Sequence, residues 1–445
     1  MNDYALHLFA GQTLVGMLTF DPRSDTYSLI YAPEWAKNLR GFALSPHLPL
    51  AGGATSGAIR RFIENLLPEG RALDVASRYS NITKNNIFGL IRHLGRETAG
   101  ALSFLPVGQT PQALAPQRRE VTRDELQQRI DARNQVPFTV WDGKVRMSVA
   151  GFQDKLLVLM DREKMFLADG ALASTHILKP EPLNSAMPFM VANEHFCMKL
   201  ASRISQRRHG QDHAAAVHIL RVPSPVLVIG RFDRQRVADS VQRIHTIDAT
   251  QALDLPVSAK YERNFGNGQD VQHIRDGMSF ARLMSTRQHL EQPAVGMQRL
   301  VFWTVTTLLL GNSDAHGKNI SFYVRKAGLS VAELYDLVSV VQYDGQQYEH
   351  DLAMAFGDEF TLDNIRAYAL ADFCLSTGIA RAFFARELTT LCKLAIDEAT
   401  AQALDPVYQG DEVDFVQKIA AFVIERARAL LKMAPDIPKF RKDNF

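Results

Sequence analysis

The pattern of apolar and polar positions changes about halfway along this chain of 445 residues. In the first half, alternating or short apolar runs bounded by turn residues predict strands at 4–9, 13–20, 26–31, 156–160, 175–179 and 226–230. Runs with helical spacing predict helices at 56–67, 122–133 and 193–203, and further on at 276–286, 295–310, 363–375, 379–398 and 412–433. A strand-rich half followed by a helical half indicates an α+β protein of two lobes with a cleft between them.

Local signals refine this pattern. The stretch 106–119 contains three prolines and is the best candidate for a linker. Thr122 is a suitable N-cap for the helix that follows, with Glu125 as its capping-box partner. The apolar run 300–310 is too short to cross a bilayer, so it predicts a buried helix that ends at Gly311.

Composition is that of a soluble globular protein. Hydrophobic residues make up 46% and charged residues 22%, and a net charge of +2 provides no strong field for nucleic acid. The basic clusters at 207–209 and 439–442 are interpreted as solvated faces. Cys197, Cys374 and Cys392 are too widely spaced for a disulfide framework or a zinc site. Without a signal peptide or an apolar run that could span a membrane, we expect a cytoplasmic protein.

A polar loop follows the predicted buried helix, and its residues would be a poor choice for packing alone. Asp314 and Asn319 are five residues apart, and Asp336 lies seventeen residues after Asn319. Phosphoryl transfer to a hydroxyl needs a carboxylate that takes the proton, and an amide oxygen and a second carboxylate that hold Mg²⁺ against the phosphates. Protein kinases keep the same interval of five between these first two groups. The alternatives are a simple helix cap and turn, or His316 as the base.

Three features upstream could hold a nucleotide. Lys179 ends a predicted strand, where an ammonium group could reach phosphates, and Glu194 on the next helix could pair with it. The turn 148–155 contains Gly151 and permits close approach of its backbone to a phosphate. The segment 229–232 could read the edge of a purine with its backbone groups. Each feature also has a simpler explanation. Lys179 could be a surface lysine and Glu194 an exposed helix residue, while 148–155 could be an ordinary turn and 229–232 an ordinary strand end.

In their order along the chain, these motifs resemble a known family. They are Ser148-Val-Ala-Gly-Phe-Gln-Asp-Lys155, Thr175-His-Ile-Leu-Lys179, Asn193-Glu194, Arg231-Phe-Asp-Arg234, Ser258-Ala-Lys-Tyr261, Gly311-Asn-Ser-Asp-Ala-His-Gly-Lys-Asn319 and Tyr335-Asp336. The chain is similar to the HipA family of serine/threonine kinases, the toxins of bacterial type II toxin–antitoxin modules. Tyr31-Ala-Pro-Glu-Trp35 and Asn65-Leu-Leu-Pro68 extend the similarity to the N-terminal residues. It therefore covers nearly the whole chain.

The resemblance implies a fold and a set of functional residues. The fold is a β-rich N-terminal part at 1–106, a kinase N-lobe with a phosphate loop at 107–230, and a helical C-lobe at 231–445. Asp314 is implied as the catalytic base, with Asn319 and Asp336 as Mg²⁺ ligands. Ser148 is implied as an inhibitory autophosphorylation site, because a phosphate there would repel ATP from the loop. The implied ATP-binding residues are Val149, Ala150, Gly151, Phe152, Gln153, Asp154, Lys155, Lys179, Arg231, Phe232, His316 and Lys318.

The resemblance also implies partners. These are a HipB-like helix-turn-helix antitoxin, operator DNA bound through that complex, and a protein substrate such as an aminoacyl-tRNA synthetase, with no membrane partner. Phe152 and Asp154 depart from the commoner Ala and Glu, and Gly230 stands where the family often has Glu. None of these changes removes a charged catalytic group, so we expect an active kinase. Two other functions stay open, a DNA-bound corepressor with dispensable kinase activity and a small-molecule phosphotransferase.

Overall fold

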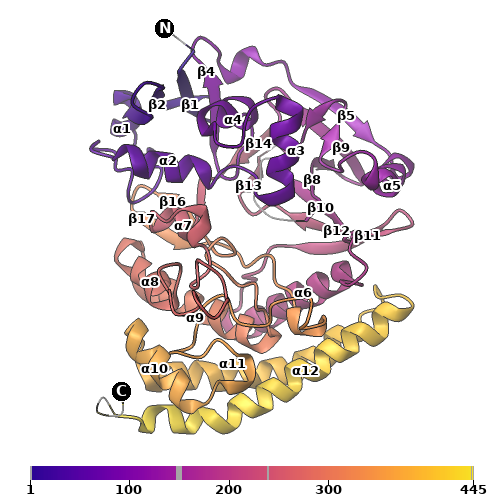
Figure 1. Ribbon diagram of the computed structural model, residues 1–445. Coiled ribbons are helices and arrows are strands. Elements are labelled where there is room, and N and C mark those ends of the chain that lie inside the picture. Colours follow the sequence, from indigo (N-terminus) through magenta and orange to yellow (C-terminus); the bar gives the residue numbers. More distant parts are fainter. Residues whose placement is uncertain (1–2, 147–152, 238–239, 442, 444) are drawn as a thin grey trace. The chain divides into compact units, whose positions relative to one another are not determined.

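A computed structural model describes residues 3–146, 153–237, 240–441, 443 and 445 of the chain (Figure 1). The chain divides into two compact units. Unit 1 comprises Met1–Pro180, Leu220–Ile247 and Phe322–Ser330, and unit 2 comprises Glu181–Ile219, Asp248–Ser321 and Val331–Phe445. Each unit therefore combines segments that are distant in the sequence. The three-part division at residues 106 and 230 remains a prediction.

Unit 1 begins with a four-stranded antiparallel sheet in the order β3-β2-β1-β4. Its strands are β1 (Ala5–Ala10), β2 (Thr13–Asp21), β3 (Thr26–Tyr31) and β4 (Leu102–Pro106). The strands predicted at 4–9 and 13–20 are confirmed and form a hairpin, and Gly11 in its turn has φ 60°, a conformation that glycine adopts without strain. The helices of this part are α1 (Pro33–Lys37), α2 (Ser56–Glu64), α3 (Gly70–Ser80) and α4 (Ile87–Leu94). Helix α2 contacts β3 and helix α4 contacts β4.

A six-stranded sheet follows, in the order β11-β12-β10-β8-β9-β5. Its strands are β5 (Gln117–Val121), β8 (Leu156–Asp161), β9 (Lys164–Asp169), β10 (His176–Pro180), β11 (Val217–Arg221) and β12 (Pro225–Gly230). Leu126 and Ile130 of helix α5 (Arg123–Asp131) pack in one buried core with apolar residues of these strands, such as Leu156 and Leu178. Burial of this apolar surface is what holds the helix on the sheet. The strands predicted at 156–160, 175–179 and 226–230 are therefore confirmed.

The predicted linker is wrong at its C-terminal end. Strand β5 lies inside it and pairs antiparallel with β9, although four of its five residues are exposed. The cap prediction beside it is confirmed, because the Thr122 hydroxyl oxygen accepts the N–H of Glu125 at 3.1 Å. The carboxylate of Glu125 accepts a hydrogen bond from Arg119 at 2.9 Å, so that strand and helix are also joined by an ion pair.

Several short strands complete the sheets, and the sequence analysis missed most of them. They are β6 (Val140–Trp141), β7 (Lys144–Val145), β13 (Arg234–Val237), β14 (Ser240–Arg243), β15 (Thr246–Asp248), β16 (Ser321–Arg325) and β17 (Gly328–Val331). Strands β15, β16 and β17 form a three-stranded sheet that the sequence analysis did not predict. The chain passes from one unit to the other at the ends of these strands.

Unit 2 is mainly helical. Its helices are α6 (Met190–His209), α7 (Ala249–Ala252), α8 (Phe280–Ser285), α9 (Pro293–Leu310), α10 (Ala367–Thr377), α11 (Arg381–Ala403) and α12 (Asp411–Met433). Helix α8 begins four residues later than predicted, where Ser279 caps it by accepting the N–H of Arg282 at 3.3 Å. Figure 1 shows α11 and α12 side by side, and both contact α6 and α9. The strand-rich unit 1 and the helical unit 2 confirm the α+β class.

Helix α9 is buried along its C-terminal half. Every residue from 300 to 310 is buried, as expected of a helix that is apolar on all sides. The buried-helix prediction is therefore confirmed. Among the described residues, no helix is both long and apolar enough to span a membrane.

Candidate active site

Helix α9 ends where the predicted catalytic loop begins. Gly311 terminates the helix in a left-handed conformation with φ 62°. A Cβ atom at this position would lie 2.7 Å from Cγ2 of Val341 and 2.9 Å from Cζ of Phe422, so only glycine fits without rearrangement. The N–H of Asn312 then donates to the Thr307 carbonyl at 3.0 Å. The loop thus leaves the helix in one fixed direction.

The loop brings the first two predicted residues together. The carbonyl oxygen of Asp314 accepts hydrogen bonds from the N–H of His316 and from Nδ2 of Asn319, both at 2.8 Å. Because the amide nitrogen of Asn319 is used in this bond, its amide oxygen is directed away and can serve as a metal ligand. Asp314 is exposed, whereas the residues on both sides of it are buried. The turn interpretation also holds, since Oδ1 of Asn312 accepts the N–H of Asp314 at 3.1 Å.

The third predicted residue, Asp336, is tied to the same loop through its neighbour. The hydroxyl of Tyr335 donates to the Lys318 carbonyl at 2.6 Å and lies 2.8 Å from the hydroxyl of Ser321. Asp336 is half-buried and has φ 57°, a region that few residues other than glycine adopt. Such conformations are common at functional sites. The Tyr335 side chain therefore connects the segment that carries Asp336 to the segment that carries Asn319, and the position of the Asp336 carboxylate as a Mg²⁺ ligand remains a prediction.

His316 and Lys318 are both buried and both hold the shape of the loop. The ammonium group of Lys318 pairs with Oδ2 of Asp248 at 2.8 Å, and Asp248 is also the N-cap of α7. Nδ1 of His316 accepts the N–H of Lys318 at 3.2 Å. His316 thus helps to fix the conformation of the loop. Contact of either residue with ATP remains a prediction.

Tyr261 was missed as a functional candidate, although it belongs to one of the motifs that carried the resemblance. Its hydroxyl donates to Oδ1 of Asp314 at 2.6 Å. The sequence holds one signal that could have revealed it, a tyrosine next to Lys260 in an otherwise polar segment. That signal has no fixed spacing from Asp314, because the contact depends on tertiary folding.

The predicted phosphate-binding residues lie in unit 1, and part of them falls outside the described residues. This applies to Ser148 and to residues 149–152, so their assigned roles remain predictions. Lys179 lies on β10 opposite Leu227, and both Lys179 and Lys155 are only 5% exposed. The surface-lysine alternative is therefore wrong for Lys179. Burial of a lysine is costly unless an anionic partner or ligand compensates its charge, and contact of Lys179 with ATP remains a prediction.

Gln153 and Asp154 are half-buried. A carboxylate oxygen of Asp154 lies 4.0 Å from the guanidinium group of Arg133. Contact of these two residues with a phosphate remains a prediction.

Arg231 and Phe232 have a different environment from the one predicted. The N–H of Arg231 donates to the Thr175 carbonyl at 2.9 Å, and the Phe232 carbonyl accepts from the Tyr323 hydroxyl at 3.2 Å. These two backbone groups of the segment 229–232 therefore have protein partners. The adenine contact remains a prediction that needs other groups of the segment.

The side chain of Arg231 belongs to a buried charge cluster in unit 1, here called the arginine cluster. Its members are Glu97, Arg231, Asp233, Arg234 and Arg243. Asp233 accepts from both Nε and Nη2 of Arg231, at 3.0 and 2.7 Å, and from Nη1 of Arg234 at 2.6 Å. Arg243 donates to main-chain carbonyls at 100 and 102, at 3.1 and 2.6 Å. The cluster therefore joins two distant segments of the chain.

Electrostatics keeps this cluster charged. Burial acts to raise the pKa of Asp233, but the guanidinium groups of Arg231 and Arg234 outweigh it and hold the pKa far below its ordinary value of 3.8. The pKa of Glu97 is lowered in the same way, against the effect of burial, by the same two arginines and Arg243. A motif predicted to form a nucleotide hinge thus supplies a structural ion network.

Two other predictions concern helix α6. Glu194 is 1% exposed, so the alternative of an ordinary exposed helix position is wrong, and its pairing with Lys179 remains a prediction. In the basic cluster, Arg207 pairs with Glu398 at 2.8 Å and Arg208 pairs with Glu387 at 2.6 Å, both on α11. These arginines are therefore partly neutralised by α11.

Comparison with known proteins identifies the family to which this chain belongs. Residues 147–403 match the family model of the HipA-like C-terminal domain, and residues 6–105 match that of the HipA N-terminal domain. The chain is 38% identical to the serine/threonine-protein kinase toxin HipA of Shewanella oneidensis over 97% of both chains. The chain belongs to the HipA family.

Other relatives agree with this assignment. A putative kinase of Sinorhizobium fredii is 33% identical over 91% of this chain and 93% of the relative. A solved complex of HipA, HipB and operator DNA from S. oneidensis matches with a TM-score of 0.88 and 37% identity, covering 98% of this chain and 100% of the other. The chain is therefore a kinase of the HipA type, and the kinase-like fold expected from the sequence is confirmed.

The HipA C-terminal match contains all the predicted catalytic and metal-binding residues. Among the described residues, no three His, Cys, Asp or Glu side chains form a group that could hold a metal ion. The predicted Mg²⁺ ligands, the amide of Asn319 and the carboxylate of Asp336, remain a prediction; Mg²⁺ at kinase sites is usually completed by phosphate oxygens and water.

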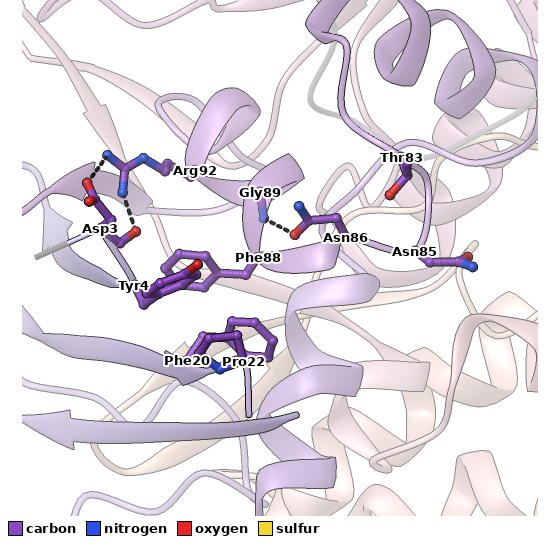
Figure 2. A pocket seen from close by; sticks show the side chains of 10 residues that line it. All are labelled: Asp3, Tyr4, Phe20, Pro22, Thr83, Asn85, Asn86, Phe88, Gly89 and Arg92. Atoms are coloured by element: carbon purple, nitrogen blue, oxygen red, sulfur yellow. Dashed lines mark hydrogen bonds and ion pairs between the residues drawn. The ribbon is translucent and has the colours of Figure 1, made fainter. Parts of the chain in front are cut away.

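The HipA N-terminal match contains an open hollow of about 530 Å³. Figure 2 shows the rings of Tyr4, Phe20 and Phe88 close together at its floor, with Arg92 bound to Asp3 at its edge. None of the predicted site residues lines it. The hollow is therefore separate from the predicted catalytic residues.

Proposed function

We propose that this HipA-type kinase is an ATP- and Mg²⁺-dependent toxin that phosphorylates a hydroxyl group of a protein substrate. The observation that carries the proposal is the geometry of the loop after α9. The loop presents one exposed carboxylate, that of Asp314. Asn319 is held beside it, because Nδ2 of Asn319 donates to the backbone carbonyl of Asp314 at 2.8 Å. The hydroxyl of Tyr335, the residue before Asp336, donates to the Lys318 carbonyl, and this bond supports a position of Asp336 near the loop.

The chemistry follows from these groups. Asp314 takes the proton of the acceptor hydroxyl while the acceptor oxygen forms a bond to the γ-phosphorus of ATP. The bond between that phosphorus and its bridging oxygen breaks, and ADP leaves. The amide oxygen of Asn319 and the carboxylate of Asp336 would hold Mg²⁺, which neutralises the phosphate charge. Lys179 is the proposed contact to the phosphates.

Partners follow from the relatives. The solved relative is a complex of HipA with HipB and operator DNA, which supports a HipB-like antitoxin and operator DNA as partners of this chain. We further propose a translation component, such as an aminoacyl-tRNA synthetase, as the substrate, and Ser148 as an autophosphorylation site. The same complex favours one second candidate, a corepressor whose kinase activity is dispensable.

One comparison of variants separates these functions. The wild-type chain and Asp314→Ala are expressed without an antitoxin, and the purified proteins are incubated with labelled ATP and a cell lysate. We expect Asp314→Ala to abolish labelling and growth arrest while operator binding with the antitoxin persists. Asp397→Ala, on the exposed face of α11, is the matched control and should label normally. Growth arrest that survives Asp314→Ala would favour the corepressor.

Autophosphorylation needs its own measurement. Intact mass of the purified kinase after incubation with ATP and Mg²⁺ should show one added phosphate, which Ser148→Ala removes. Addition of EDTA should abolish it in the wild type. A phosphate that persists in Ser148→Ala would place the modification elsewhere.

A further inference from the structure

Tyr261 touches the proposed catalytic base directly. Its hydroxyl donates to Oδ1 of Asp314 at 2.6 Å, a length typical of a hydroxyl bound to an ionised carboxylate. Asp314 is exposed and Tyr261 is half-buried. An exposed aspartate side chain samples several rotamers, and a strong hydrogen bond to a fixed donor selects one of them.

The backbone on one side of Tyr261 is held by the catalytic loop itself. The carbonyl of Lys260 accepts the N–H of Gly317 at 2.9 Å. Gly317 lies only three residues after Asp314. A backbone hydrogen bond therefore joins the segment that carries the Tyr261 hydroxyl to the loop that carries Asp314. This arrangement fixes the distance from which the tyrosine approaches.

The backbone on the other side is held by a second connection. The N–H of Glu262 donates to the Ala353 carbonyl at 2.9 Å, and the N–H of Ala353 donates to the Ser313 carbonyl at 3.0 Å. Glu262 is buried and its carboxylate accepts from Nε of Arg275 at 2.7 Å. A Cβ atom on Gly277 would lie 1.8 Å from the Tyr261 carbonyl, so this close approach needs glycine.

The ring of Tyr261 is also confined. His316 meets it edge-on, with ring centroids 4.9 Å apart and an interplanar angle of 88°. The ammonium group of Lys260 lies 5.4 Å from the ring centroid. Contacts at the ring and on both sides of the backbone leave the hydroxyl little freedom to move, which is the condition for a group that orients another.

We propose that Tyr261 is a positioning residue that fixes the orientation of the Asp314 carboxylate for removal of the acceptor proton. This inference rests on the proposed role of Asp314 as the base. Tyr261 does not itself receive the proton or touch the phosphate. The competing explanation is purely structural, in which the bond only anchors the segment that follows Tyr261.

The first test separates turnover from binding. Tyr261→Phe removes the hydroxyl and keeps the ring, so we expect kcat to fall about tenfold to a hundredfold, the size of effect that misplacement of a catalytic group produces. The KM values for ATP and for the acceptor, and the affinity for a non-hydrolysable ATP analogue, should stay within about twofold. An unchanged kcat, or a fall in kcat that is matched by loss of nucleotide affinity, would overturn the positioning role.

The second test asks whether the donor or the bulk matters. Replacement of Tyr261 by 4-aminophenylalanine restores a donor at nearly the same reach, and 4-methylphenylalanine restores only size. We expect the amino group to recover most of the lost kcat and the methyl group to recover none. Equal recovery by both would assign Tyr261 a packing role. Because the two variants are matched in size, this comparison holds even if Tyr261→Phe folds poorly.

Two further variants complete the design. Tyr408→Phe removes a buried hydroxyl elsewhere in unit 2, one that lies 2.9 Å from Nδ1 of His195, and should lower stability without changing kcat. Asp314→Ala tests the proposed function itself. If Asp314→Ala keeps its kinase activity, the proposed function fails. If Asp314→Ala is inactive while Tyr261→Phe keeps full kcat, only the present inference fails.

Discussion

The arginine cluster of unit 1 and the catalytic loop of unit 2 are both dense groups of polar side chains, and they use those groups in opposite ways. In the cluster, Asp233 is 6% exposed and accepts hydrogen bonds from two arginines. In the loop, Asp314 is exposed and its neighbours are buried around it. One arrangement satisfies charges internally, while the other supports one carboxylate that faces solvent.

This difference shows how to distinguish residues with a structural role from residues with a functional role among the motifs of one family. Arg231 and Asp314 both belong to motifs that carried the resemblance to the HipA family. The bonds of Arg231 end on protein groups within unit 1. The bonds around Asp314 mostly fix its backbone and its orientation, and they leave the side chain at the surface. Substitutions should therefore affect stability in the cluster and turnover in the loop.

The largest effect on stability is expected for Asp233→Asn. This change leaves Arg231 and Arg234 buried without their main anionic partner, and breaking a buried ion pair from one side typically costs about 3–5 kcal/mol. Urea denaturation of the purified kinase, followed by a probe in unit 1, would measure the loss.

An exposed pair provides the control for that measurement. Asp25 pairs with Arg60 at 2.9 Å, and both side chains are well exposed. Asp25→Asn should therefore cost less than about 1 kcal/mol. Equal losses for Asp233→Asn and Asp25→Asn would remove the distinction between a buried network and a surface pair.

The next effect should appear at Tyr335, which sharpens the catalytic side of the comparison. Tyr335→Phe removes the bonds to the Lys318 carbonyl and to Ser321, so we expect a loss of about 1–2 kcal/mol in stability. Because Asp336 follows directly, we also expect kcat to fall about tenfold and the Mg²⁺ concentration for half-maximal activity to rise.

Tyr323→Phe is the matched control in unit 1. Its hydroxyl donates to the Phe232 carbonyl at 3.2 Å, so its loss should lower stability by a similar amount. The half-maximal Mg²⁺ concentration should stay unchanged. An equal shift in Mg²⁺ requirement for both variants would argue against a specific role of Tyr335 beside Asp336.

The sequence predicted the elements with strong local patterns and missed those that depend on tertiary contacts. Helix α9 and its end at Gly311 follow from an apolar run and one glycine. Strand β5 is exposed at four of its five positions, so its polar sequence resembled a linker. The spacing of Asp314 and Asn319 identified the loop, whereas Tyr261 reaches it from 53 residues away in sequence. No local pattern encodes such a contact.

A smaller effect is expected from acid. The pKa of Asp233 is lower in the folded kinase than its ordinary value of 3.8, because Arg231 and Arg234 outweigh the effect of burial. Its contribution to stability is therefore complete above about pH 5 and is lost as the pH falls below 4. The difference in unfolding free energy between wild type and Asp233→Asn should shrink by about 1 kcal/mol between pH 7 and pH 3.

The difference in unfolding free energy between wild type and Asp233→Asn does not include acid-sensitive groups that contribute equally to both proteins. Burial lowers the pKa of His245 to about 4, so its protonation destabilises wild type and variant alike. A difference that stays constant down to pH 3, measured by urea unfolding at each pH, would show that Asp233 is not the titrating member of the cluster.

The smallest effect should be found where ions pair at the edge of unit 2, between α6 and α11. Arg208 pairs with Glu387 at 2.6 Å, but the Arg208 side chain is 28% exposed, so water and salt screen the interaction. Arg208→Ala should cost less than about 1 kcal/mol, and added salt should reduce the cost further. If the paired cluster does not bind nucleic acid, the same variant should leave operator binding by the antitoxin complex unchanged in a filter or mobility assay at several salt concentrations. A weaker salt dependence of binding in Arg208→Ala would instead mean that this arginine contacts phosphates, since each lost phosphate contact lowers the slope by about one.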